Sequence, residues 1–140
     1  MAFPEIQHCL ICEDVRLERG GLGTLIGFYG IAPDVEILVR NLNAPIERLC
    51  FLLTAKAGGT GKHTISAQIL GEDEKEIAAF KGLHWKANEQ KPNARHSFAL
   101  AVGAPRFTKP GTYTFRLFAD DTLTFETTFV VRQGEEADFK

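Results

Sequence analysis

The side chains best suited to contact a ligand or a partner lie in one irregular stretch, 81–88, which holds the only tryptophan of the chain. Here His84, Trp85 and Lys86 place an aromatic ring among cationic and amide groups. Such a combination on a loop can stack on a base or a sugar ring, or anchor a protein partner. A single tryptophan is also a common residue of protein cores, so burial of Trp85 is the competing interpretation. These three residues form the candidate contact site.

Two cysteines, Cys9 and Cys12, have the Cys-x-x-Cys spacing found in zinc sites and thiol redox centres. No second pair follows, because Cys50 is the only other cysteine. On a continuous strand, residues three apart face opposite sides of the sheet. We therefore expect the thiols to be buried as small apolar groups, with no disulfide, no bound metal and no cofactor.

Glycine-rich stretches do not match the known nucleotide-binding motifs. In the stretch 58–64 a phosphate-binding loop would need glycine at Lys56 and serine or threonine at His63, and the sequence that follows is typical of a strand rather than a helix. The glycines at 21, 23 and 27 likewise miss the dinucleotide-binding spacing. Both stretches are better explained as loops between strands.

Carboxylates cluster at three places, and loop-end clusters of this kind can hold calcium in a sandwich. Turn chemistry accounts for two of the clusters, which leaves calcium as the minor alternative. The four histidines have no neighbouring nucleophile motif, which argues against a catalytic triad and mildly against an enzyme. The clusters are Glu13–Asp14, Glu72–Glu74 and Asp120–Asp121.

The composition is that of one soluble domain over residues 1–140, with 44% hydrophobic and 24% charged residues. A net charge of -2 gives no general attraction for nucleic acid or for an anionic membrane, so neither is an expected partner. The apolar runs have the length of strands and the N-terminus carries no targeting pattern. With an odd number of cysteines, these features predict a cytoplasmic protein.

Alternation with a period of two dominates the chain, and no helical pattern recurs. The run 24–29 is apolar at both parities, which predicts a strand lying deeper in its sheet than 11–18, its hairpin partner. The run 49–54 has the same character and predicts a central strand buried on both sides, joined by a hairpin loop to 64–69. Residues 79–95 are expected to be mainly loop, and the tail from about 133 to be frayed. The remaining expected strands are 35–40, 96–102, 113–117 and 123–131.

Eight or nine short strands without helices predict two packed antiparallel sheets. The Pro110-Gly111 turn followed by Tyr113, Phe115 and Leu117 resembles the closing strands of immunoglobulin-like and fibronectin-like sandwiches, in which an inward tyrosine fixes the corner. The resemblance implies an immunoglobulin-like antiparallel β-sandwich.

The front of the chain, 12–29, resembles a family of uncharacterised bacterial and phage-associated domains. The shared features are a charged strand with a Val-Arg-x-Glu sequence, a glycine-rich turn and a Leu-Ile-Gly strand. The turn here is Arg-Gly-Gly-Leu-Gly at 19–23, where a Gly-Lys pair is the usual pattern. This resemblance supports the fold and implies no activity.

The sequence thus favours a non-catalytic binding or assembly module of a bacterial or phage-derived system, with a protein as its partner. The first alternative is a small-ligand module of carbohydrate-binding type, which requires Trp85 to be exposed on a concave surface. The second is an enzyme, which requires a pocket that gathers His84 or His96 with carboxylates.

The N-terminal strand begins with the apolar pattern of Ile6, His8 and Leu10, and we expect it to form a sheet edge. A possible homodimer follows from this position, most simply with two-fold symmetry. It would form by edge pairing or by packing of apolar residues near the N-terminus against the second copy.

Overall fold

The computed structural model describes residues 2–17, 23–42, 44–46, 48–87, 90, 93, 96–103 and 105–139. The glycine-rich turn expected at 19–23 lies largely outside the described residues, as does position 88. In the described part the strands are β1 (Ile6–Leu17), β2 (Gly23–Ile31), β3 (Glu36–Val39), β4 (Arg48–Ala55), β5 (Lys62–Leu70), β6 (Glu76–Lys86), β7 (His96–Gly103), β8 (Gly111–Ala119) and β9 (Thr122–Gln133), followed by a short 3-10 helix, η2 (Glu136–Phe139). No helix in the described ranges is long and apolar enough to cross a membrane.

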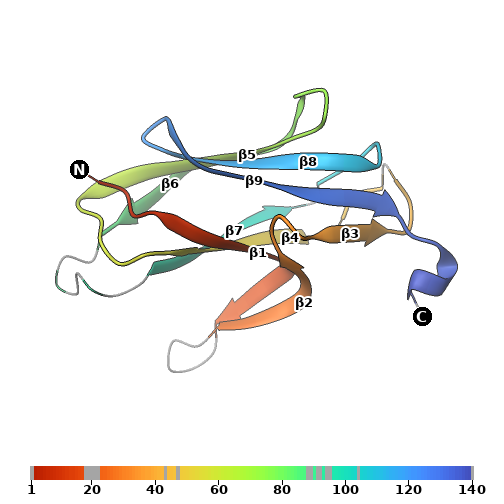
Figure 1. Cartoon of the computed structure of the whole chain (residues 1–140), viewed down its shortest axis with the longest axis horizontal. Coiled ribbons are helices and arrows are strands. Elements are labelled where there is room, and N and C mark those ends of the chain that lie inside the picture. Colours follow the sequence, from red (N-terminus) through yellow and green to blue (C-terminus); the bar gives the residue numbers. More distant parts are fainter. Residues whose placement is uncertain are drawn as a thin grey trace.

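These strands form two layers (Figure 1). Sheet 1 has the strand order β2-β1-β4-β7, and sheet 2 has the order β3-β9-β8-β5-β6. All strand pairs are antiparallel except β3 with β9, which is parallel. The pairs β1-β4-β7 and β9-β8-β5 reproduce the A-B-E and G-F-C neighbours of an immunoglobulin sandwich. The predicted immunoglobulin-like β-sandwich is confirmed, with the one parallel contact as its departure from an antiparallel design.

Aromatic side chains join the two sheets in the core. Phe51 of β4 stacks on Phe115 of β8 with ring centroids 4.3 Å apart and planes 12° from parallel, and Phe129 of β9 lies 5.9 Å from Phe51. As predicted, Tyr113, Phe115 and Leu117 point inward and are buried. The Tyr113 hydroxyl donates a 2.6 Å hydrogen bond to the carbonyl of Lys109, which is the tyrosine corner of immunoglobulin-like folds.

One strand was missed by the sequence prediction. Strand β6 occupies much of the stretch 79–95 that we expected to be mainly loop, and it forms one edge of sheet 2. Its alternation is obscured because its register against β5 shifts between Ile65 and Ala67, and because Gly82 has a φ of 79°. As an edge strand it also keeps many exposed residues, which hides the pattern of a buried face.

Three predictions about which strands are neighbours, and which lie at an edge, are wrong. Strand β1 is not an edge, since it pairs with β2 on one side and β4 on the other, whereas β2 is the edge strand and not the deeper one. Strands β4 and β5 do not form a hairpin, because the loop between them crosses from sheet 1 to sheet 2. The prediction that 49–54 forms a central strand is confirmed, since β4 lies between β1 and β7, but the apolar character of the edge strand β2 at both parities needs another explanation than central burial.

The tail from about 133, for which the sequence predicted a frayed end, contains η2. The Gly134 amide donates to the Val39 carbonyl at 2.9 Å, and the Arg40 guanidinium lies 4.4 Å from the centroid of the Phe139 ring. These contacts hold the last described residues against the end of β3.

The inward and outward faces of β8 predict opposite responses to mutation. Replacing the buried Phe115 with alanine removes its stacking on Phe51 and leaves a cavity, so we expect a loss of about 3 to 5 kcal/mol in the free energy of unfolding. Thr114→Ala on the outer face should cost about 1 kcal/mol or less. Denaturant titrations of the two variants check this, and equal losses would contradict the assigned core face.

Candidate functional site

The structure separates the three residues of the predicted contact site. His84, Trp85 and Lys86 lie in strand β6 rather than in a loop, so successive side chains alternate between its two faces. Trp85 is half-buried and packs against the core, while His84 and Lys86 are exposed. The three side chains do not converge on one surface.

The Trp85 ring belongs to an aromatic cluster that closes one end of the sandwich. Its centroid lies 5.3 Å from Phe3 and 5.0 Å from His96, both in edge-to-face geometry, and 5.8 Å from His63. The His96 Nε2 is in turn 3.1 Å from the Gly58 carbonyl. Trp85 is therefore not the exposed platform that a carbohydrate-type module requires.

The nearest approach to an acid-base pair is His63 with Asp120. His63 is 3% exposed, and its Nδ1 lies 2.6 Å from the Asp120 carboxylate while its Nε2 lies 2.7 Å from the Thr60 carbonyl. Thr60 lies in the loop between β4 and β5, and Asp120 lies in the turn between β8 and β9. The two contacts of the His63 ring therefore connect this loop to this turn. Hydrogen bonds from the Thr64 amide and from His63 lower the pKa of the Asp120 carboxyl. The His63–Asp120 pair therefore stabilises the fold by linking two loops of the sandwich.

Two of the three carboxylate clusters lie in turns and act there mainly as hydrogen-bond acceptors, whereas Glu13 and Asp14 lie in strand β1. Glu72 accepts from the Thr112 amide at 3.0 Å, and Asp73 accepts from the Lys75 amide at 3.1 Å. Glu74, Asp120 and Asp121 have φ values of 60°, 51° and 65°, as tight turns require. Among the described residues, no group of three or more histidine, cysteine or acidic side chains could hold a metal ion.

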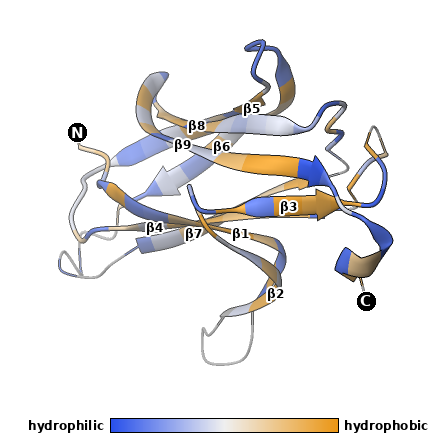
Figure 2. Ribbon diagram, turned by 45° about the vertical axis from the view of Figure 1, so that its right-hand side comes forward, coloured by the Kyte–Doolittle hydropathy of each residue, from blue (hydrophilic) through white to orange (hydrophobic). Residues whose placement is uncertain are grey.

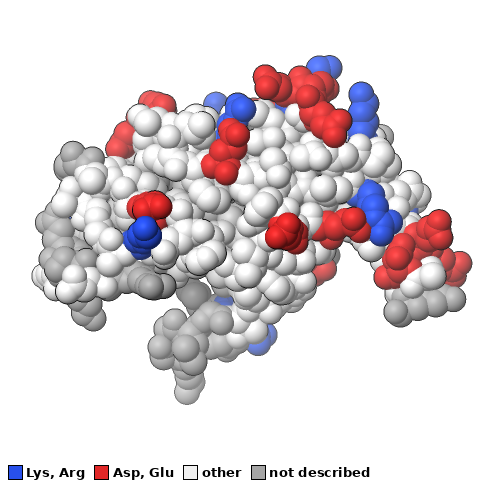
Figure 3. Space-filling model, in the orientation of Figure 1, with Lys and Arg blue, Asp and Glu red and all other residues white. Residues whose placement is uncertain are grey.

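The outer faces of the two sheets differ in the polarity of their central side chains. On sheet 2, Arg116 pairs with Glu126 and Arg132 pairs with Glu36, each at 2.7 Å, among serine, threonine and glutamine side chains and the half-buried Leu38, Phe118 and Val130. In the view of Figure 3, most of the visible charged side chains lie over sheet 2 and at the C-terminal end. This is the solvated surface expected of a sheet that is covered on one side only.

Sheet 1 carries apolar and small residues on its outer face instead, arranged in rows across the strands. We call the first row the leucine row and the second the thiol row. The register places Ile31, Leu10, Leu52 and Ala99 side by side in the leucine row, and Phe28, Cys12, Cys50 and Ala101 in the thiol row. Together these eight side chains form an apolar centre without a charged group.

Much of this surface is open to solvent. Ile26, Phe28 and Ile31 of the edge strand β2 are 39%, 53% and 50% exposed, so no described part of the chain covers that side of β2. Figure 2 shows the hydrophobic colouring along β2, which projects from the body of the sandwich. Residues 23–31 also contain neither a charge nor a proline, the two devices that most often protect an edge strand.

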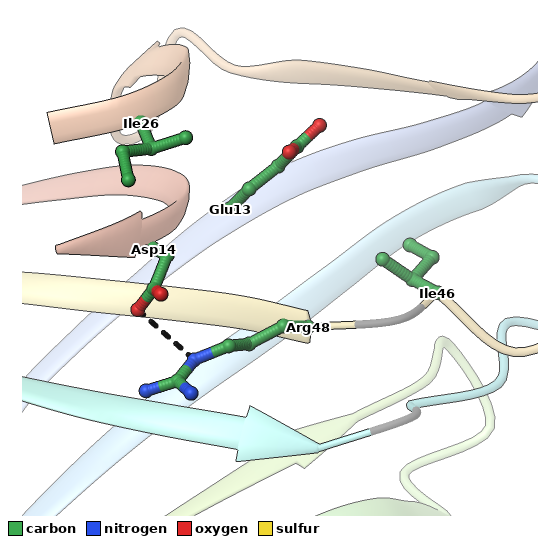
Figure 4. A pocket seen from close by; sticks show the side chains of 5 residues that line it. All are labelled: Glu13, Asp14, Ile26, Ile46 and Arg48. Carbon is green, nitrogen blue, oxygen red and sulfur yellow. Dashed lines mark ion pairs between the residues drawn. The ribbon is translucent and has the colours of Figure 1, made fainter.

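Polar groups border the apolar centre on two sides. On one side, the Arg48 guanidinium pairs with Asp14 at 3.0 Å in a hollow of about 550 Å³ that Glu13, Ile26 and Ile46 also line (Figure 4). On the other side, His8 lies 3.2 Å from the Thr54 hydroxyl, beside Ser97 in the register. An apolar centre with a polar rim is the usual anatomy of a protein interface.

A family model matches residues 7–132. The chain belongs to the family of unknown function DUF6941. This agrees with the resemblance of the front of the sequence to a family of uncharacterised domains.

Solved structures resemble this DUF6941 domain at low identity. An immunoglobulin-like protein from Pseudomonas aeruginosa is 18% identical, with a TM-score of 0.41 over 94% of this chain and 98% of that chain. The alkylpurine DNA glycosylase AlkC of Pseudomonas fluorescens, bound to DNA containing an abasic site analog, is 15% identical with a TM-score of 0.45. That match covers 72% of this chain and 28% of the glycosylase, so the domain spans little more than a quarter of its length. No curated protein matches the sequence.

The cysteines of this DUF6941 domain divide between the two faces of sheet 1. Cys9 lies in the core, whereas Cys12 faces Cys50 in the thiol row, so the prediction that Cys9 and Cys12 point to opposite sides is confirmed. All three are buried and unbridged. Burial is the main cause that raises the pKa of Cys9 and of Cys50 to about 12, and it also raises the pKa of Cys12.

The sequence analysis missed the outer face of sheet 1 as a candidate site. The sequence indication was the apolar content of 24–29 and 49–54 at both parities, which burial of both faces of these strands by the chain itself also explains. Small residues at 97, 99 and 101 were a second signal, because they flatten the same face.

The raised pKa values of the thiols predict that they react slowly with thiol reagents in the native protein. At pH 8 a thiol with a pKa near 12 is ionised in only about one molecule in ten thousand, so we expect the native protein to react with an aromatic disulfide reagent at least about 100-fold more slowly than the unfolded chain. The same reagent in denaturant should titrate all three cysteines. Rapid reaction of Cys50 in the native protein would contradict its burial in the thiol row.

Proposed function

We propose that this DUF6941 domain is a non-catalytic assembly module and that the outer face of sheet 1 is its docking surface. The observation that carries the proposal is the group of eight adjacent apolar and small side chains at the centre of the outer face of sheet 1, where the outer face of sheet 2 carries cross-strand ion pairs. Large exposed apolar patches rimmed by polar groups mark protein interaction sites in soluble proteins. The outer face of sheet 1 offers apolar side chains and few charges to a ligand. The apolar surface of another protein is the kind of partner that matches it best.

The arrangement of polar groups also supports a role without catalysis. Both nitrogens of the His63 ring contact groups of the protein itself, the Asp120 carboxylate and the Thr60 carbonyl, and the ring is 3% exposed, so neither nitrogen is directed at a substrate. Among the described residues, neither His84 nor His96 is hydrogen-bonded or ion-paired with a carboxylate: His84 is exposed on β6, and His96 contacts the Gly58 carbonyl and Trp85.

We also propose that the domain works in the cytoplasm. The three unbridged cysteines are compatible with a reducing compartment, where buried thiols remain reduced.

Site-directed photo-crosslinking tests the docking surface. A photoreactive phenylalanine analogue replaces Phe28, which is 53% exposed, and in a matched control it replaces Leu123, which is 49% exposed in the β8–β9 hairpin of sheet 2. In cells that naturally express the domain, we expect light-dependent adducts of discrete mass from position 28 and none from position 123. Adducts from neither position, or equally from both, would contradict the proposed surface.

A further inference from the structure

We infer that the partner on the outer face of sheet 1 is a second copy of the chain, packed face to face about a two-fold axis that crosses the strands between the leucine row and the thiol row. The inference rests on the proposed function and names the occupant of the same surface. The argument depends on the order of the rows, on the charges at the rim and on the size of the face.

The order of the rows makes the face complementary to itself. Leu10 and Leu52 form a ridge, while Cys12, Cys50 and Ala101 form a lower strip directly beside it. Rotation about the stated axis places the leucine row of each copy over the thiol row of the other. On the two inner strands, Leu10 of one copy then lies over Cys12 of the other and Leu52 over Cys50, so larger side chains meet smaller ones at the centre of the contact. On the outer strands, Ile31 lies over Phe28 and Ala99 over Ala101. Facing layers of a sheet sandwich pack at a spacing of about 10 Å.

The buried position of the thiols fits this arrangement. Cys12 and Cys50 are 0% and 1% exposed although they lie on the outer face. A second copy that packs on Leu10 and Leu52 therefore needs no rearrangement of the thiols. The most exposed apolar residues, Phe28 and Ile31, occupy the same two rows and are exchanged by the axis.

Charge at the rim is also matched by the same axis. The row beyond the thiols contains Asp14 and Arg48, which neutralise one another at 3.0 Å, so two copies bring no net charge into the contact. The row beyond the leucines contains His8 and Thr54. Rotation brings each of these rows toward the other, so that Asp14 of one copy approaches His8 of its neighbour. No carboxylate of these rows meets its own equivalent.

The size of the face sets the expected strength of the dimer. Four strands about 4.8 Å wide and four rows about 6.7 Å wide give a footprint of about 19 Å by 27 Å, or roughly 500 Å². Stable protein complexes commonly bury about 800 Å² of accessible surface on each partner, so this contact is smaller than a standard interface and fits a weak, transient dimer. We expect a reversible dimer with a Kd of about 10 to 100 µM.

Sedimentation equilibrium over about 1 to 500 µM tests the inference. The wild-type mass should rise from 15.5 kDa toward twice that value. Leu52→Glu, at the centre of the leucine row, should weaken association at least about ten-fold, because a carboxylate would be buried against the thiols. Thr114→Glu is the matched control on the outer face of sheet 2, again at a half-buried position of an inner strand, and should leave the mass unchanged. Denaturant titration confirms that both variants are folded.

The rim provides a second test that does not disturb the fold, because His8 is exposed. His8→Lys should tighten the dimer and His8→Glu should loosen it, each by about two- to five-fold, since this residue approaches Asp14 of the other copy. Equal effects of the two substitutions would overturn the proposed axis.

The outcomes separate the inference from the proposed function. A wild-type chain that remains at 15.5 kDa throughout, while position 28 crosslinks to a different protein, overturns the second copy and leaves the docking surface standing. A dimer that Leu52→Glu does not weaken places the contact elsewhere and also overturns the inference. A monomer without adducts at position 28 removes both.

Discussion

The stacking of Phe51 on Phe115 is the contact on which the rest of the structure depends. It joins β4, an inner strand of sheet 1, to β8, an inner strand of sheet 2, with centroids 4.3 Å apart. Phe129 and Tyr113 extend the contact along sheet 2, with a stacked pair at 6.0 Å, and Phe107 meets both rings edge to face. Once these rings are enclosed, the inward parity of each neighbouring strand is decided, because a shift of one residue would turn the core outward.

The same constraint decides what the outside of sheet 1 must be. With Phe51 pointing inward, Cys50 and Leu52 must point outward, and their register partners on β1 and β7 follow. Polar residues at these outward positions would give an ordinary solvated face, as Arg116 and Glu126 do on sheet 2. The domain instead keeps apolar groups there, and apolar patches on soluble proteins commonly mark interaction sites. This contrast is the basis of the docking role proposed for the face.

The sequence predicted the sandwich because alternation is a local property. Tyr113, Phe115 and Leu117 could be assigned to the core from their spacing alone, and the corner tyrosine from its Pro-Gly turn. Whether a second layer covers the other face of a strand is not a local property of the sequence. Strand β2 and strand β4 are apolar at both parities, and the sequence gives the same pattern whether the second face is covered by the chain itself or left open. Trp85 was likewise ambiguous, since its place depended on β6 being a strand and on Phe3 reaching it from the N-terminus.

The two ends of the chain lie at opposite ends of the long axis of the molecule (Figure 1). A pull on both ends would therefore run along β1 and β9, the first and last strands. Strand β1 is held by β4 from Ile6 to Cys12, and β9 by β8 along the whole of β8. Hydrogen bonds between antiparallel strands lie perpendicular to the strands. Such a force would shear many of these bonds at once instead of opening them one by one, so the fold is arranged to resist tension along its length.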